Sequence, residues 1–157
     1  MEKFTIDRID RKILRILQDD GRLSNVALAK AVGLSPTPCL ERVRKLERHG
    51  VIEGYYARVN PDKLGSPLLI FVEITLTRTS ADSFAEFSEA ARRTDEILEC
   101  HLVSGNFDFL IKARVADMAS YRRLLGETIL NMPGVNESRT YVVMEAIKQE
   151  NKVLIRG

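Results

Sequence analysis

Residues 24–50 read SNVALAKAVGLSPTPCLERVRKLERHG and decide the fold of the first third of the chain. A short helix pattern begins after Ser24 and ends at Gly33, and a second helix pattern begins after Ser35. Two short helices joined by a tight turn can present the second helix to the major groove of DNA. That second helix carries four cations, Arg42, Arg44, Lys45 and Arg48.

The second helix of this pair opens on Ser35-Pro36-Thr37-Pro38. Ser35 is placed to cap it, and both prolines fall in the first turn, where a missing N–H costs little. At about 100° per residue, Leu40, Val43 and Leu46 form the buried stripe. The candidate DNA-contacting residues are Ser35, Pro36, Thr37, Pro38, Arg44, Lys45 and Arg48, with Arg42 on the flank. For any one of these cations, a solvated charge is the alternative, and Glu41 and Lys45 have the spacing of a helix ion pair.

A further helix is predicted upstream of this pair. Its apolar residues recur at spacings of three and four from Ile6 to Leu17, it begins near Asp7 or Asp10, and it ends at Asp20-Gly21. Downstream, residues 51–59 alternate around Glu53-Gly54 and predict a short hairpin. Three helices and a hairpin make a winged helix-turn-helix, so residues 1–60 are predicted to form a DNA-binding domain.

The pattern changes after residues 61–67, a linker rich in turn-forming residues. From there to about residue 150 the sequence predicts the order βαββαβ. The expected elements are a strand over 70–76, a helix from about 80, strands over 97–103 and 107–115, a helix around 118–129, and a strand over 139–147. This order gives an antiparallel sheet with both helices on one face. Leu69, Phe71, Tyr141 and Val143 are predicted on the other face, which favours a partner subunit as its cover.

Charge and composition agree with these two parts. The 157 residues are 45% hydrophobic and carry a net charge of +2. Residues 1–60 hold 12 basic and 8 acidic side chains, a balance of +4, which leaves about −2 for the rest. A basic front half favours an anionic partner there, although an ordinary solvated surface would have the same balance.

The cysteines and the hydropathy of the sequence indicate the cellular compartment of the protein. The two cysteines, Cys39 and Cys100, lie far apart in the sequence and favour a reduced, intracellular protein. The longest apolar run, residues 68–72, is too short to cross a bilayer. We therefore expect a cytoplasmic protein with no membrane partner.

Residues 104–108, Ser-Gly-Asn-Phe-Asp, form the most suggestive loop of the second domain. Amides at a glycine turn can hold a carboxylate and Asp108 can hold an ammonium group, which together suit a free amino acid. An ordinary hairpin turn is the alternative. His49 and His101 lack metal-ligand spacing, and the chain has neither a glycine-rich phosphate loop nor a nucleophile elbow. We therefore predict no enzyme, no catalytic residue, no metal and no cofactor.

Four segments of the chain carry a family resemblance. The four segments are LSPTPCLERVRKLERHGVIEGY, FVEITL, ECHLVSGNFDFL and PGVNESRTYVVMEAIK. They resemble the Lrp/AsnC transcription regulators, and the resemblance runs from about Asp7 to Lys152. It implies a helix-turn-helix at about residues 25–44 and a ferredoxin-like domain that binds an effector and oligomerises. It also implies dimers assembled into octamers or similar discs that wrap DNA. Leucine or another amino acid would then shift assembly and DNA affinity.

Carried over residue by residue, the effector response falls on Leu102, Asp108, Met118, Tyr141, Val142 and Val143, with Gly105 and Asn106 beside them. Relatives frequently have Asp in place of Asn106, so ammonium recognition here has one charge fewer. The predicted function is a sequence-specific, nucleoid-associated activator or repressor of amino-acid metabolism genes. Two alternatives stay open: an architectural DNA-binding protein with weak ligand response, and an amino-acid-binding regulatory subunit of an enzyme.

Overall fold

The computed structural model describes residues 4–156, so the first three residues of the predicted DNA-binding domain lie outside it. The chain forms two compact units. One unit runs to Arg58 and takes in the C-terminal segment from Gln149, and the other spans Val59–Lys148. No helix in the described part of the chain has the length and apolar character needed to span a membrane.

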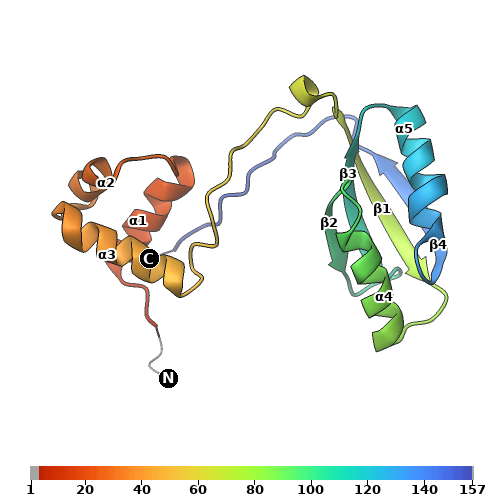
Figure 1. Ribbon diagram of the computed structural model, residues 1–157, viewed down its shortest axis with the longest axis horizontal. Coiled ribbons are helices and arrows are strands. Elements are labelled where there is room, and N and C mark those ends of the chain that lie inside the picture. Colours follow the sequence, from red (N-terminus) through yellow and green to blue (C-terminus); the bar gives the residue numbers. More distant parts are fainter. Residues whose placement is uncertain (1–3, 157) are drawn as a thin grey trace. The chain divides into compact units, whose positions relative to one another are not determined.

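The first unit is built from three helices, α1 (Arg8–Asp19), α2 (Asn25–Val32) and α3 (Pro36–Arg48) (Figure 1). The predicted caps are confirmed for α1 and α2. Asp7 accepts hydrogen bonds at the start of α1, Ser24 accepts one at the start of α2, and Gly33 ends α2 at φ 79°. Fully buried residues from all three helices, with Ile13, Leu28 and Leu46 among them, form one small core.

The predicted hairpin over residues 51–59 is wrong, because no strand is present there. The backbone amides of Val51 and Ile52 both donate to the Leu46 carbonyl, at 2.9 and 3.3 Å, so these residues complete the end of α3. Their side chains pack against the helical core. Tyr55 donates to Glu47 at 3.1 Å and so also lies against α3. Val51, Ile52 and Tyr55 therefore contact the helical unit instead of pairing in a hairpin.

The second unit has the predicted order βαββαβ, which confirms the ferredoxin-like fold class. Its elements are β1 (Leu68–Leu76), α4 (Ala81–Arg92), β2 (Ile97–Leu102), β3 (Phe109–Val115), α5 (Met118–Arg123) and β4 (Val135–Val142). Short helical turns occupy Asp62–Leu64 and Ile129–Asn131, and α5 continues as a π-helical segment over Leu124–Thr128. The strands pair antiparallel in the order β2-β3-β1-β4.

Both long helices cover the same face of this sheet (Figure 1). Alternate residues of β1 and β3, such as Val72 and Ile111, are fully buried and pack with Phe87 of α4 and Tyr121 of α5. The other face carries Phe71, which is half-buried. Of the residues predicted there, Tyr141 is 45% exposed but Leu69 only 6%.

The last strand differs from its prediction by several residues. It was expected over 139–147, but β4 spans Val135–Val142 and pairs with β1 from Leu76 back to Ile70. The apolar run around Val143 and Met144 suggested a strand interior. The Val143 amide still donates to the Leu69 carbonyl at 3.0 Å, but β1 begins at Leu68, so the pairing ends there and Met144 is fully exposed.

Candidate nucleic-acid interface and effector region

The orientation of α3 is set by its buried residues. Cys39 and Leu46 are fully buried and Val43 is half-buried, so this side of the helix faces the core. Leu40, predicted in the buried stripe, is 36% exposed, and Cys39 takes the inner position in its place. The side away from the core carries the predicted DNA-contacting residues Thr37, Arg44, Lys45 and Arg48, all exposed.

The two prolines change the chemistry at the start of α3. Ser35 occupies the N-cap, but its hydroxyl makes no cap hydrogen bond. Ser24 accepts from the amide of the third residue of α2, and the third residue of α3 is Pro38, which has no amide to donate. The start of the helix is held instead by Asn25, whose side-chain amide donates to the Pro36 carbonyl at 2.8 Å. Ser35 and Thr37 are therefore exposed polar side chains at the helix start.

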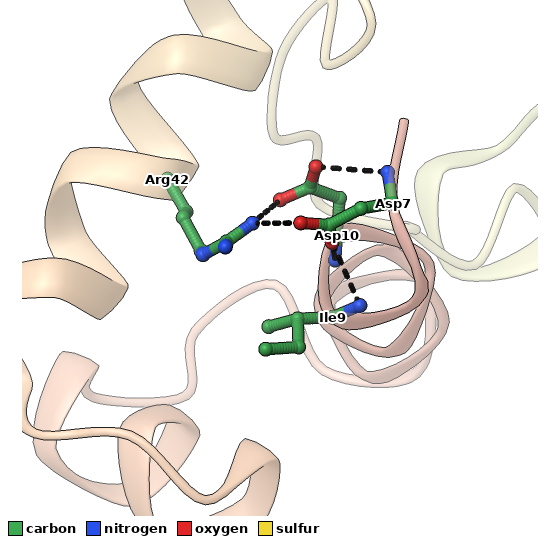
Figure 2. Close-up of polar contacts among 4 residues, drawn as sticks. All are labelled: Asp7, Ile9, Asp10 and Arg42. Carbon is green, nitrogen blue, oxygen red and sulfur yellow. Dashed lines mark hydrogen bonds and ion pairs between the residues drawn. The ribbon is translucent and has the colours of Figure 1, made fainter. Parts of the chain in front are cut away.

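Arg42 lies on the inner flank of α3 and points at the start of α1 (Figure 2). Its guanidinium is 2.7 Å from a carboxylate oxygen of Asp7 and 2.7 Å from one of Asp10. The Asp10 side chain is only 9% exposed, and it also accepts a hydrogen bond from the Asp7 amide at 3.1 Å. The prediction that Arg42 contacts DNA finds no support in this geometry, since the side chain joins two helices of its own unit.

The same cluster shifts two pKa values. The pKa of Asp7 is lowered, chiefly by the hydrogen bond from the Asp10 amide; desolvation raises it, and the hydrogen bond and charge of Arg42 lower it further. The pKa of Arg42 is raised, first by its hydrogen bond to Asp10 and then by that to Asp7. Asp7 and Arg42 are therefore both charged at neutral pH.

The remaining cations of α3 differ in their surroundings. The Lys45 ammonium lies 5.1 Å from the centre of the Phe4 ring, which in turn stacks on His49 at 4.2 Å. Within residues 4–156, neither Arg44 nor Arg48 has an ion pair or hydrogen bond from its side chain. These two guanidinium groups are the ones left to meet phosphate or guanine.

In the second unit, the loop at residues 103–108 connects β2 to β3. Val103 donates to the Asp108 carbonyl, and Asp108 donates to the Ile74 carbonyl, both at 2.9 Å. One carboxylate oxygen of Asp108 accepts from the Leu76 amide at 2.7 Å. Asp108 therefore ties the loop to β1, and only its other oxygen is left for a ligand.

A cavity of about 230 Å³ lies beside this loop, on the face of the sheet that α4 and α5 do not cover. We call this face the open face. Its lining combines the predicted Asn106 with residues that sequence reasoning missed, Glu73, Thr75, Phe107, Glu137, Ser138 and Arg139. Tyr141 donates to Glu73 at 3.0 Å, so its hydroxyl reaches the same cluster. The pKa of Arg139 is raised, first by hydrogen bonding with Tyr141 and then by the charge of Glu73. One sequence signal that could have located this site is Glu73, the single charged residue of β1.

The predicted effector residues do not come together in one chain. Leu102, Gly105, Asn106 and Asp108 lie where β3 begins, with Phe109 paired to Ile74. Met118, Val142 and Val143 lie where β3 ends, with Val115 paired to Leu68. The seven residues of β3 separate the two groups by roughly 20 Å at about 3.3 Å per residue. Within one chain, the Gly105 loop therefore lies near Leu102 and Asp108 and far from Met118, Val142 and Val143.

The described residues were found to hold neither a metal cluster nor a cysteine with a lowered pKa. No group of three or more His, Cys, Asp or Glu side chains in this part of the chain is arranged to hold a metal ion. Cys39 is buried and Cys100 half-buried, and burial raises the pKa of both thiols. Raised values disfavour the reactive thiolate.

Comparison with known proteins covers both units. Residues 6–53 match a model described as winged helix-turn-helix DNA-binding, and residues 69–153 match the Lrp/AsnC ligand binding domain. The leucine-responsive regulatory protein of Escherichia coli K12 is 62% identical over 151 residues, which is 96% of this chain and 92% of that protein. The protein of the same name from Klebsiella pneumoniae matches to the same extent.

Solved structures agree over nearly the whole chain. A transcriptional regulator from Neisseria meningitidis, solved as a complex with L-Met, superposes with a TM-score of 0.91 at 33% identity and covers 96% of this chain and 97% of its own. AsnC from Escherichia coli superposes with a TM-score of 0.87 at 26% identity, covering 95% and 99%. The chain described here belongs to the Lrp/AsnC family of DNA-binding transcription regulators.

Proposed function

We propose that this regulator reads DNA with α3 and changes its DNA affinity when a free amino acid binds its second domain. Residues 1–60 would form the DNA-binding domain, residues 61–67 the linker, and residues 68–150 the sensing and oligomerisation domain. The observation that carries the proposal is the exposed side of α3, where Arg44 and Arg48 lack partners within the described residues. Such a regulator acts at the nucleoid, in the cytoplasm.

On DNA, the start of α3 would lie in the major groove. Ser35 and Thr37 would meet base edges, and Pro36 and Pro38 would pack against them, because recognition helices contact bases near their N-termini. Arg44, Lys45 and Arg48 would meet phosphates or guanine. Arg42 is left out of this set because Asp7 and Asp10 hold it.

Arg44→Ala and Arg48→Ala test this arrangement, with Arg78→Ala as a control of equal charge in the second unit. Each α3 variant should weaken DNA binding and reduce the slope of log affinity against log salt by about 1 if the lost contact is to phosphate. Fluorescence anisotropy with labelled duplex across a salt series measures both. If both variants bind as tightly as the parent, α3 does not carry the DNA contacts. The first unit would then dock protein, as in the regulatory-subunit alternative.

The cavity beside residues 103–108 has the charges that a free amino acid requires. Arg139 can pair with a carboxylate, and Glu73 or Glu137 can accept an ammonium group. Leucine and methionine are the first ligands to test, because relatives are named leucine-responsive and one neighbour binds L-Met. Asp108 would hold the loop in shape and leave one oxygen toward the ligand.

Self-association would complete the sensing site. Met118 and Val142 are 48% and 40% exposed, and they are too far from the loop to touch a ligand bound there in the same chain. They would act between copies of the chain, in a dimer formed through the open sheet face and in octamers or similar assemblies of that dimer. An amino acid that prefers one assembly shifts the equilibrium by its difference in affinity for the two states.

Isothermal titration calorimetry with leucine and methionine tests the sensor, using Arg139→Ala as the variant and the exposed Arg122→Ala as the control. We expect binding to the parent and control, and binding at least tenfold weaker to Arg139→Ala, since an unpaired ligand carboxylate costs about 1.4 kcal/mol or more. If the parent binds neither amino acid while still binding DNA, the architectural alternative is favoured.

A further inference from the structure

The last residues of the chain pack with the DNA-binding unit. The segment from Gln149 belongs to the same compact unit as α1, although it follows β4 of the other unit (Figure 1). Its contacts with α1 run in a regular antiparallel order: Lys152 meets Asp19, Val153 meets Gln18, and Ile155 meets Arg15. We call Lys152, Val153, Leu154 and Ile155 the tail.

The central contact is a two-point hydrogen bond between Gln18 and Val153. The Val153 amide donates to the Gln18 side-chain oxygen at 2.6 Å, and the Gln18 side-chain nitrogen donates to the Val153 carbonyl at 3.0 Å. The side-chain amide thereby serves both backbone groups of one residue, as a neighbouring strand would. This pairing fixes the position of the tail along α1.

Two further contacts between the tail and α1 lie on either side of this pair. Arg15 donates from Nε and Nη2 to the Ile155 carbonyl, at 3.3 and 2.9 Å. The Lys152 ammonium is 2.6 Å from a carboxylate oxygen of Asp19, and this contact raises the pKa of Lys152. Residues 15, 18 and 19 of a helix share one face, so a single side of α1 receives the tail. An exposed ion pair contributes little by itself, which leaves Gln18 and Arg15 as the main determinants.

We propose that this face of α1 is a docking surface for the chain's own C-terminal tail, which makes the tail a second tether between the sensing domain and the DNA-binding unit. The first tether is the linker that leaves α3. The second begins at β4, the strand that supplies Glu137 and Arg139 to the cavity. A ligand that moves the end of β4 can therefore act on α1 through the tail.

Amide hydrogen exchange of the full-length protein, resolved at Val153, tests the docking. In the parent, the Val153 amide should exchange at least tenfold more slowly than expected for an unstructured chain. Gln18→Ala should remove this protection, because alanine keeps the helix but loses both hydrogen bonds. Lys30→Ala, an exposed change on α2, should leave it intact. Unprotected Val153 in the parent, or equal protection in Gln18→Ala, would overturn the docking.

The role of the tail in regulation rests on the proposed function. It is tested by measuring amino-acid binding and DNA affinity in the same two proteins. Amino-acid binding measured by calorimetry should be the same in the parent and Gln18→Ala, while the fold-change in DNA affinity caused by the amino acid should be smaller in the variant. If the parent itself shows no such fold-change, the proposed function fails. If parent and variant show the same fold-change, the tail does not transmit the signal.

Discussion

At the scale of single residues, Arg42 shows how one side chain can change role once its neighbours are known. It lies among cations on a helix predicted to bind DNA, yet its partners Asp7 and Asp10 are 35 and 32 residues away in the sequence. No local pattern contains such a pair. The sequence could identify the basic helix but could not separate the cation that joins two helices from the cations that stay exposed.

Arg42→Ala should therefore destabilise the protein, whereas Arg44→Ala should not. Loss of Arg42 leaves the nearly buried Asp10 without its cation, at a cost of about 1–3 kcal/mol in the free energy of unfolding. Arg44 is exposed and should change this free energy by less than about 0.5 kcal/mol. Urea denaturation followed by circular dichroism measures both. Equal stability of the two variants would contradict the structural role of Arg42.

The lowered pKa of Asp7 predicts a loss of stability in acid. The folded protein holds the Asp7 proton more weakly than the unfolded chain, whose value is near 3.8. The contribution is therefore complete above that value and is lost as the pH falls through the lower folded pKa. Asp7→Asn keeps the cap acceptor but not the charge, so its urea midpoint should fall less steeply in that range. The control is Asp95→Asn, an exposed change that should retain the slope of the parent.

At the scale of elements, the start of α3 differs from the start of α2 although both have serine at the N-cap. Ser24 accepts a hydrogen bond from the Ala27 amide at 3.2 Å, but Ser35 makes no such bond because Pro38 lacks the amide. A sequence pattern that contains Ser-Pro-X-Pro predicts the helix boundary correctly. It also shows that the serine is left available for another partner.

Ser24→Ala should therefore cost about 1 kcal/mol in the free energy of unfolding, the usual effect of a lost N-cap. Ser35→Ala should leave this free energy nearly unchanged and weaken DNA binding instead. Thermal denaturation and the anisotropy titration measure the two effects. A stability loss in Ser35→Ala as large as that in Ser24→Ala would contradict the account of the prolines.

The helices and the strand order follow from local caps and apolar periodicity, which act over a few residues. What depends on pairing between distant segments is harder to predict. The position of β4 is decided by the length of β1, and the absence of the hairpin is decided by the packing of Val51 and Ile52 against the helices. For the same reason the cavity residues from β1 and β4 meet only when those strands are placed side by side.

At the scale of the whole molecule, the open sheet face concerns assembly, and the tail concerns the link between the two units of one chain. Phe71 lies in the middle of this face, paired across the strands with Tyr141 and Lys112. If two copies join through this face, Phe71→Asp would place a carboxylate in an apolar contact and should shift the protein toward monomers. Sedimentation equilibrium measures the change, with Ala85→Asp on the helix side as control. Unchanged association of Phe71→Asp would place the subunit contact elsewhere.

Loss of assembly should also weaken DNA binding, because linked copies of α3 bind one duplex with higher avidity than a single copy. On the proposed function, the chain thus joins the DNA contact of each α3 to an assembly that a ligand can shift.

Regulated DNA binding is tested most directly by one titration. The full-length protein is titrated onto a duplex that it has selected from a random library, across a salt series, with and without leucine or methionine. We predict that affinity falls linearly with log salt and that an amino acid changes it at least fivefold at constant salt, equivalent to about 1 kcal/mol of coupling. An affinity that no amino acid alters at any salt concentration would contradict the sensor, and an affinity independent of salt would contradict binding by the cations of α3.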